Sequence, residues 1–457
     1  MSLSGQSKMS ARLHRLRPSA RKVVLLTWEA VDRGVPLQAA LSQVLQDMSL
    51  SGETRRQATD LAYWTFRGML RCTFVLQTLF PRFDKFLSPV RRLLVIAAAA
   101  LLFQERAPQY AIVNETVADI AQLAGKGVAG AANGGLRNLL RLGQAVHTQE
   151  FYRQSSDRDD YAAFLRLVSI PPGIGYLLRR ELGEEAARRA LRQSFERPVA
   201  ALRVNIARTG WQDTMSLLRQ AGGQPLPGKA GQRGLWFPDG LPASVSVQEL
   251  IASGRVSSQS AGSQLVLAHL EFPDEAPVWD VCAGFGGKTM ALLEEGHAVT
   301  LATDISWRRL SHLSGECARL GLNVPHVLLA DGTRPPLDSW PGHVLLDVPC
   351  SGLGVLGRRP DIKLREPDIA AYTRVQKELV QSLLQRMTRG RCLAYITCTL
   401  TCQENEQLLR EALEGTGAHI LNEWLPGTET LTAPGAVQGG SSREFPVEGM
   451  YAALVQV

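Results

Sequence analysis

The sequence contains few cysteines, and none of them form a Cys-x-x-Cys pair. Among 457 residues the seven cysteines are scattered, at positions 72, 282, 317, 350, 392, 398 and 402. Cys398 and Cys402 are four apart with no histidine nearby, which is a poor arrangement for zinc. An odd number of scattered cysteines without a secretion signal indicates a reducing compartment. We therefore expect a cytoplasmic protein without a metal site.

Long apolar runs are also missing. The longest, Leu93 to Phe103, is well short of the roughly 18–20 residues that a membrane span requires. We expect it to form a buried helix, and we expect no membrane partner. Apolar residues make up 45% and charged residues 20% of the chain, as in globular proteins. A chain of this length divides into two or three domains, because single cores stop growing at roughly 250–300 residues.

Acidic residues are fewer than basic residues. The chain has 50 Lys and Arg against 43 Asp and Glu, for a net charge of +7, and its pI of about 9.1 makes a nucleic-acid partner plausible. Residues 1–22 hold basic residues and no acid: Lys8, Arg12, Arg15, Arg17, Arg21 and Lys22. This tail could be an RNA-contacting arm or a transit peptide, although a frayed, solvated terminus is the simpler interpretation.

The apolar spacing divides the rest of the chain into four parts. Residues 23–142 show helical periodicity and predict an all-α domain, with breaks at Ser51-Gly52, Ser88-Pro89 and Gly125 to Gly130. Residues 143–160 turn polar and lose this period, as a linker does.

Residues 161–271 mix helical and strand patterns and predict a small α+β module. A helix from Gly175 to Phe195 precedes a strand from Val199 to Asn205 and a helix from Trp211 to Ala221. The first helix is rich in arginine. It either contacts phosphates or is a solvated surface balanced by its glutamates.

Residues 272–457 alternate short apolar runs with helical patterns. Strands are expected at Val278 to Val281, Ala298 to Thr303, His326 to Leu329, His343 to Leu346 and Cys392 to Ile396. This alternation predicts a Rossmann-like α/β domain with a doubly wound, mostly parallel sheet, which binds ligands at the carboxyl ends of its strands.

The first motif at such an end is Asp280-Val281-Cys282-Ala283-Gly284-Phe285-Gly286-Gly287-Lys288-Thr289. A phosphate loop is excluded by spacing, because Cys282 stands where its first glycine is required. An ordinary turn is one alternative, and a nucleotide-binding turn is the other. Asp304 and Asp331 end the next two strands and could hold the ribose and adenine of a cofactor, although aspartates at strand ends also form turns.

Two further motifs place thiols at the same edge. One is Asp347-Val348-Pro349-Cys350-Ser351-Gly352, and the other is Thr397-Cys398-Thr399 followed by Glu404-Asn405-Glu406. A buried cysteine is usually a small hydrophobic residue, and we give that interpretation to Cys72, Cys317, Cys392 and Cys402.

Together these three motifs resemble the Sun (Fmu) family of RNA cytosine-5 methyltransferases. The second one extends through Leu356 to Arg359-Pro360-Asp361-Ile362-Lys363 in the family's order. The all-α region resembles the NusB-like RNA-binding domain of bacterial family members that act on small-subunit ribosomal RNA, through Ala111 to Glu115 and Asn133 to Arg137. The middle module is similar to theirs at Pro171-Pro172 and Leu202 to Asn205. The chain departs from the family at Gly284-Phe285, usually Ala-Pro, and at Glu448-Gly449-Met450-Tyr451, usually Asp-Gly-Phe-Phe.

The resemblance implies S-adenosylmethionine as cofactor, RNA as partner and a covalent mechanism. Cys398 would add to carbon 6 of a cytosine, Asp347 would hold and protonate the ring, Cys350 would assist elimination and Lys288 would position the reacting groups. The cofactor would be bound by Cys282, Ala283, Gly284, Phe285, Gly286, Gly287, Lys288, Asp304, Asp331 and Asp347. Two rivals are a non-catalytic RNA-binding assembly or antitermination factor and a methyltransferase acting on protein or small molecules.

Overall fold

The structure, a computed structural model, describes residues 13, 16–104, 108–424, 430–433 and 443–457. Contacts within the chain divide it into two compact units. The helical unit comprises Met1–Leu177 and Leu356–Glu366, and the sheet unit comprises Leu178–Val355 and Pro367–Val457. Most of the basic tail lies outside the described residues, and the domain boundaries drawn from the sequence stay a prediction.

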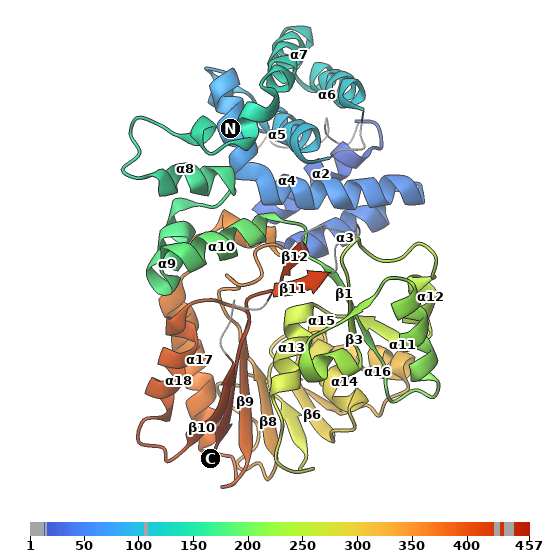
Figure 1. Cartoon of the computed structure of the whole chain (residues 1–457), viewed down its shortest axis with the longest axis vertical. Helices are drawn as coiled ribbons and strands as arrows, with labels where there is room; N and C mark the ends of the chain where they lie inside the picture. The colour runs from blue at the N-terminus through green and yellow to red at the C-terminus, as the bar shows by residue number, and fades with distance from the viewer. Residues whose placement is uncertain (1–12, 14–15, 105–107, 425–429, 434–442) are drawn as a thin grey trace. The chain divides into compact units, whose positions relative to one another are not determined.

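The helical unit is all-α, as its periodicity predicts. Its helices are α2 (Ala20–Asp32), α3 (Leu37–Asp47), α4 (Gly52–Leu79), α5 (Ser88–Phe103), α6 (Gln109–Ala124), α7 (Lys126–Arg141), α8 (Asp160–Leu167) and the first part of α9 (Pro172–Leu182) (Figure 1). The expected breaks lie between helices: the Ser51 side chain caps α4, Pro89 stands in the first turn of α5, and Gly125 separates α6 from α7 with a φ of 88°.

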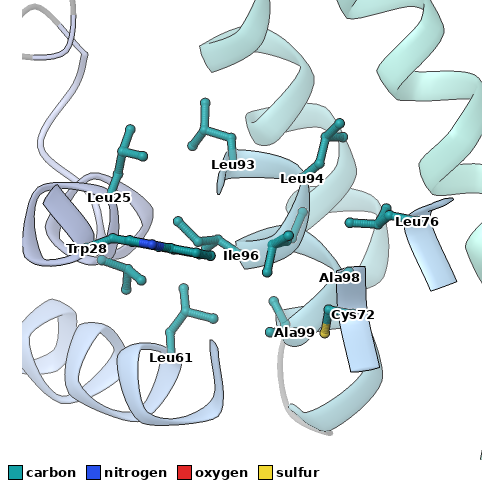
Figure 2. Packing of buried hydrophobic residues seen from close by; sticks show 14 of the residues in the cluster. Leu25, Trp28, Leu61, Cys72, Leu76, Leu93, Leu94, Ile96, Ala98 and Ala99 are labelled. Carbon is teal, nitrogen blue, oxygen red and sulfur yellow. The ribbon is translucent and has the colours of Figure 1, made fainter. Parts of the chain in front are cut away.

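The apolar run of α5 forms the centre of this unit. Leu93, Leu94 and Ile96 are fully buried against α2 and α4, and Figure 2 shows the Trp28 ring of α2 extending toward Ile96. Each such side chain contributes roughly 1.5–3 kcal/mol through its burial. The predicted buried helix is confirmed, and in the described ranges no single helix is long and apolar enough to cross a membrane; only α8 and α9 together pass that test, across a bend of 115°.

The polar stretch after α7 belongs to the helical unit and packs against α4. It forms two 3-10 turns, η2 (Gly143–His147) and η3 (Glu150–Tyr152). The buried Arg71 of α4 holds both, donating to the Tyr152 hydroxyl at 2.9 Å and to the Val146 carbonyl at 2.8 Å.

The sheet unit begins with the small module. Its elements are α10 (Glu184–Phe195), β1 (Ala200–Val204), α11 (Trp211–Gln220), β2 (Gln224–Pro225), β3 (Gly234–Phe237), α12 (Val247–Ala252), β4 (Val256–Ser258) and α13 (Ala261–His269), and its antiparallel strands run in the order β2-β3-β1-β4. The expected single helix from Gly175 to Phe195 was wrong. It is two helices, because Gly183 adopts a φ of 77°, which interrupts the α-helical backbone between them.

A buried ion-pair cluster attaches the module to the rest of the sheet unit. Arg203 of β1 contacts Glu294 at 2.6 Å, with both side chains at most 2% exposed, and Arg233 contacts Glu294 at 3.3 Å. Arg203 also donates to the carbonyl of Gly287 at 3.2 Å. Gly287 of the glycine motif is therefore held in place by a residue of the small module.

The remaining strands form one mostly parallel sheet. The strands are β5 (Val278–Asp280), β6 (Val299–Asp304), β7 (His326–Leu329), β8 (His343–Asp347), β9 (Cys392–Thr397), β10 (His419–Trp424) and β13 (Tyr451–Gln456), and the described part of the sheet has the order β10-β13-β9-β8-β5-β6-β7. Only β13 runs antiparallel to its neighbours β9 and β10. A separate hairpin pairs β11 (Thr430–Ala433) with β12 (Arg443–Pro446).

Helices cover both faces of this sheet. The residues of α17 (Ile369–Leu384) and α18 (Glu406–Leu413) pack on one face, and those of α13 and α14 (Gly287–Glu294) pack on the other. Two further helices, α15 (Trp307–Leu310) and α16 (Leu313–Leu320), pack beside α14. The predicted doubly wound α/β domain is confirmed.

Candidate functional site

The sheet changes winding direction at β5. The chain winds from β5 to β6 and β7 on one side, and β8 and β9 lie on the other. Ligands bind beyond the carboxyl ends of the strands at such a switch point. The sequence motifs follow these ends, since β5, β6 and β8 finish at Asp280, Asp304 and Asp347, and β9 finishes at Thr397.

The glycine motif forms a tight turn between β5 and α14. Gly284 and Gly286 have φ angles of 58° and 82°, in the left-handed region that favours glycine. Gly286 donates to the Ala283 carbonyl at 2.8 Å, which closes the turn. A Cβ on Gly287 would meet no atom within 4 Å, so the backbone there is open to a ligand. Phe285, the departure from the family pattern, is 59% exposed, and its ring lies 5.5 Å from that of His312.

Asp304 fixes this turn to the next strand. Its buried carboxylate accepts hydrogen bonds from the Gly284 and Ser306 amides at 2.9 and 2.8 Å, and Arg309 lies 2.7 Å away. A carboxylate has about four acceptor positions, so one remains for a ribose hydroxyl. Ile305 next to it is 69% exposed and offers apolar surface to a purine. The exposed Asp331 accepts from the amide and hydroxyl of Thr333.

Asp280 lies beneath the turn as a buried acid. Thr289 donates to one of its oxygens at 2.5 Å, while the other has no hydrogen-bond partner in the described part of the chain. Burial raises the pKa of Asp280 to about 7. Asp280 begins the sequence motif but is not among the residues expected to form the site.

Two thiols meet at the ends of β8 and β9. The sulfur atoms of Cys350 and Cys398 are 3.3 Å apart, and the Cys398 amide also donates to the Cys350 sulfur at 3.3 Å. Both residues are half-buried. The hydrogen bond from Cys350 lowers the pKa of the Cys398 thiol, and the same bond together with burial raises the pKa of Cys350. The pair therefore favours a thiolate at Cys398 and a thiol at Cys350.

Lys288 joins the glycine turn to these thiols. Its ammonium group donates to the Asp347 carboxylate at 2.5 Å. Burial acts to lower the pKa of Lys288, but the charge and hydrogen bond of Asp347 outweigh it and raise this pKa. The ammonium charge in turn favours the Cys398 thiolate. The four predicted catalytic residues thus share one neighbourhood.

Glu404 holds the two thiol loops together. One carboxylate oxygen accepts from the Ser351 amide at 2.9 Å and from Gln376 at 3.1 Å. The other accepts from the hydroxyls of Ser351 and Thr401 at 2.5 and 2.8 Å. Glu404 is 0% exposed, and the loops after Cys350 and Cys398 both depend on it. The sequence carried a signal for Glu404, in the Glu-Asn-Glu motif, and none for Gln376, an ordinary polar residue of α17.

Glycines bring the segment before β13 against the Cys350 loop. Gly449 donates to the Gly354 carbonyl and Gly354 donates to the Cys398 carbonyl, both at 3.0 Å. A Cβ on Gly354 would lie 1.8 Å from the Gly449 carbonyl oxygen, so only glycine fits there. The departure at Glu448 is accommodated locally, because its carboxylate accepts from the Gly262 amide at 2.9 Å.

The other cysteines lie apart from these thiols. Cys72, Cys317 and Cys392 are buried among apolar residues, while Cys402 donates to Glu181 at 2.8 Å. Cys282, assigned to the cofactor site, belongs to the glycine motif, and burial raises its pKa. Among the described residues, no group of three or more His, Cys, Asp or Glu is placed to hold a metal ion.

Comparisons with known proteins agree with this geometry. Residues 267–455 match the family model described as 16S rRNA methyltransferase RsmB/F, and residues 18–141 match the NusB family. The chain is 30% identical over 422 residues to the ribosomal RNA small subunit methyltransferase B of Vibrio cholerae, covering 90% of this chain and 93% of that one. It is 28% identical over 413 residues to the protein of the same name from Yersinia enterocolitica, covering 88% and 90%.

Solved structures share the fold. The crystal structure of PH0851 aligns over 96% of this chain and 98% of its own, with a TM-score of 0.70 and 19% identity. NSun6 from Pyrococcus horikoshii, solved with SFG, aligns over 63% of this chain and 98% of its own, with a TM-score of 0.50 and 21% identity.

Proposed function

Since the chain belongs to the RsmB/F family of S-adenosylmethionine-dependent RNA cytosine-5 methyltransferases, we propose that it methylates small-subunit ribosomal RNA through a covalent adduct with Cys398. The observation that carries this proposal is the meeting of two thiols beside the ion pair of Lys288 and Asp347. A ribosomal RNA substrate is what the names of the relatives support, and the cytoplasmic location expected from the cysteines suits such a substrate.

The reaction begins with Cys398. Carbon 5 of cytosine is a poor nucleophile, and addition of a thiolate to carbon 6 turns it into an enamine carbon that can accept a methyl group. The hydrogen bond from Cys350 and the charge of Lys288 both stabilise the Cys398 thiolate before addition. These neighbours increase the fraction of attacking thiolate at neutral pH.

Asp347 and Lys288 act on the ring. Addition at carbon 6 places negative charge on the ring, which a proton held at nitrogen 3 neutralises. The Lys288 ammonium supplies that proton through the Asp347 carboxylate, which it contacts at 2.5 Å and which holds the proton against the ring. Lys288 therefore positions Asp347 and supports Cys398 at the same time.

Cys350 acts at the end of the reaction. The carbon-5 proton must leave before the bond between Cys398 and carbon 6 can break and restore the ring. The Cys350 sulfur lies 3.3 Å from the Cys398 sulfur, close to the bond that breaks. Cys350 donates its proton to the leaving Cys398 sulfur, and the Cys350 thiolate that results takes up the carbon-5 proton.

The residues at the glycine turn fit an adenosine-containing cofactor. The backbone at Gly287 is open, Asp304 has an acceptor position left, and one oxygen of the buried Asp280 lacks a partner among the described residues. Asp304 and the exposed Ile305 would hold the nucleoside, and the amides at 284–287 would border the rest. When bound, S-adenosylmethionine supplies an electrophilic methyl group on its sulfonium sulfur.

The RNA must present an accessible base. Carbon 5 cannot be reached in a stacked helix, so the cytosine is extruded or already single-stranded. The NusB-like region and the arginines of the small module would hold the flanking phosphates, a contribution that weakens with salt. Glu184 pairs with both Arg179 and Arg188, so this stretch of arginines is partly neutralised.

The test uses single cysteine variants. Each is incubated with labelled S-adenosylmethionine and unmodified small-subunit ribosomal RNA, and the labelled nucleotide is mapped. Cys398→Ser should abolish transfer, Cys350→Ser should accumulate a denaturant-resistant protein–RNA adduct, and Cys402→Ser is the matched control that should retain activity. Equal losses in Cys398→Ser and Cys350→Ser without an adduct would contradict the assignment.

A further inference from the structure

The two thiols at the site lie in direct sulfur contact. Their sulfur atoms are 3.3 Å apart and in hydrogen-bond contact, whereas a disulfide has an S–S distance of about 2.05 Å. The two sulfur atoms would have to approach each other by roughly 1.2 Å to form that bond. Both residues stand on short loops at the ends of neighbouring parallel strands, whose register pairs Asp347 with Ile396.

We propose that Cys398 and Cys350 are a site of reversible oxidation, at which a peroxide converts the two thiols into an intramolecular disulfide. The thiol chemistry stands on the geometry alone, while its effect on methyl transfer rests on the proposed function. No other pair of cysteines is in sulfur contact in the described part of the chain, where the remaining five occupy separate surroundings.

The oxidation proceeds in two balanced steps. The Cys398 thiolate attacks one oxygen of the peroxide, the O–O bond breaks, hydroxide leaves, and Cys398 becomes a sulfenic acid. The Cys350 sulfur then attacks the Cys398 sulfur and forms the S–S bond. The hydroxide that leaves takes up the Cys350 proton as water. Two thiols are thereby oxidised to one disulfide, and one hydrogen peroxide is reduced to two waters.

The surroundings of Cys398 and Cys350 give the two thiols different roles in the oxidation. The hydrogen bond from Cys350, with a smaller contribution from the charge of Lys288, lowers the pKa of the Cys398 thiol, and Cys398 therefore reacts first. Cys350 stays protonated and in contact, as a resolving thiol does. Glu404 fixes both loops from behind and keeps the sulfur atoms together.

Oxidation would switch the enzyme off and protect it. A sulfur atom held in a disulfide cannot add to carbon 6, so transfer stops until a thiol reductant restores Cys398. Without Cys350, the sulfenic acid would advance to sulfinic acid, which reductants do not reverse. The second thiol therefore also prevents permanent damage to the first.

The experiment exposes the full-length protein to hydrogen peroxide and maps its thiols by alkylation and peptide mass spectrometry. We expect a peptide pair joined through Cys350 and Cys398, loss of two alkylated positions from the seven cysteines, and recovery of both with dithiothreitol. Cys402→Ser is the matched control and should form the same disulfide. Cys350→Ser should instead accumulate sulfinic acid at Cys398 that dithiothreitol does not remove.

Two results would overturn the inference. In one, both thiols remain open to alkylation after peroxide treatment. In the other, Cys398 reaches sulfinic acid in the unmodified sequence while Cys350 stays free. Methyl transfer to RNA is measured on the reduced and oxidised protein separately. If the disulfide forms but the reduced protein has no transfer activity, the result contradicts the proposed function and supports the oxidation site.

Discussion

Replacing Glu404 tests whether the network behind the thiols holds the site together. In Glu404→Ala, four hydrogen-bond donors lose the carboxylate: the Ser351 amide and hydroxyl, the Thr401 hydroxyl and the Gln376 amide group. The Ser351 hydroxyl keeps Thr399 and Gln376 keeps the Pro349 carbonyl. The Ser351 amide and the Thr401 hydroxyl have no other acceptor among the described residues.

These losses set the size of the effect. An unsatisfied buried donor costs about 1–3 kcal/mol, so two of them cost roughly 4 kcal/mol. A unit of this size loses about 2–4 °C of melting temperature per kcal/mol, or roughly 8–16 °C in total. Glu404→Gln should cost only about 1–2 kcal/mol, because its amide can face the hydroxyls of Ser351 and Thr401, which can rotate to accept.

The assay is thermal unfolding of the three proteins, followed by methyl transfer at a temperature where all remain folded. We expect the melting temperature to fall in the order Glu404, Gln, Ala, with transfer slowed in both variants because the thiol loops loosen. Glu411→Ala, which removes an exposed glutamate on α18, is the control and should change stability by less than about 1 kcal/mol. An unchanged melting temperature in Glu404→Ala would refute the reasoning.

Three further outcomes are expected. Arg203→Met leaves the buried Glu294 with less compensation and should destabilise the protein by about 3–5 kcal/mol in denaturant unfolding; full stability would show that the pair adds nothing. Because Asp280 has a pKa of about 7 when folded and near 4 when unfolded, the folded state binds the extra proton between these values, so stability falls as pH rises through that window. Comparison of unfolding at several pH values should give a loss of roughly 2–4 kcal/mol that Asp280→Asn abolishes, and parallel profiles would contradict the pKa. Finally, alkylation of Cys398 by iodoacetamide should level off at a lower pH than that of Cys402, whose pKa burial and Glu181 raise to about 11; peptide mapping that finds one common profile would count against a stabilised thiolate.

The periodic parts of the fold could be predicted from the sequence. The parallel strands and the helix at Leu93 carry apolar patterns that depend on local burial, and the structure places them where these patterns indicate. The helix predicted from Gly175 to Phe195 was wrong because the amphipathic spacing continues across Gly183. Whether the helix itself continues there is decided by the backbone conformation of this one glycine. Periodicity does not report a single φ angle.

The reacting groups of the site could be predicted from the sequence, whereas the residues that hold them in place could not. Cys350, Cys398, Asp347 and Lys288 belong to compact motifs at strand ends, and the sheet topology alone brings such ends together. Gln376 lies on a helix far along the chain from the residues it contacts, and no local pattern marks a glutamine that reaches Glu404. Such partners become visible only when the chain is folded.

The eleven-residue excursion Leu356–Glu366 changes what the two compact units are. The polypeptide leaves the sheet unit after Val355, places Lys363 and its 3-10 turn within the helical unit beside Arg67, and returns at Pro367. The helical unit and the sheet unit are therefore connected by more than one stretch of backbone. A single cut in the chain therefore cannot separate the two units. A fragment that starts near residue 178 would expose Lys363, which is buried in the intact protein, and its apolar neighbours to water.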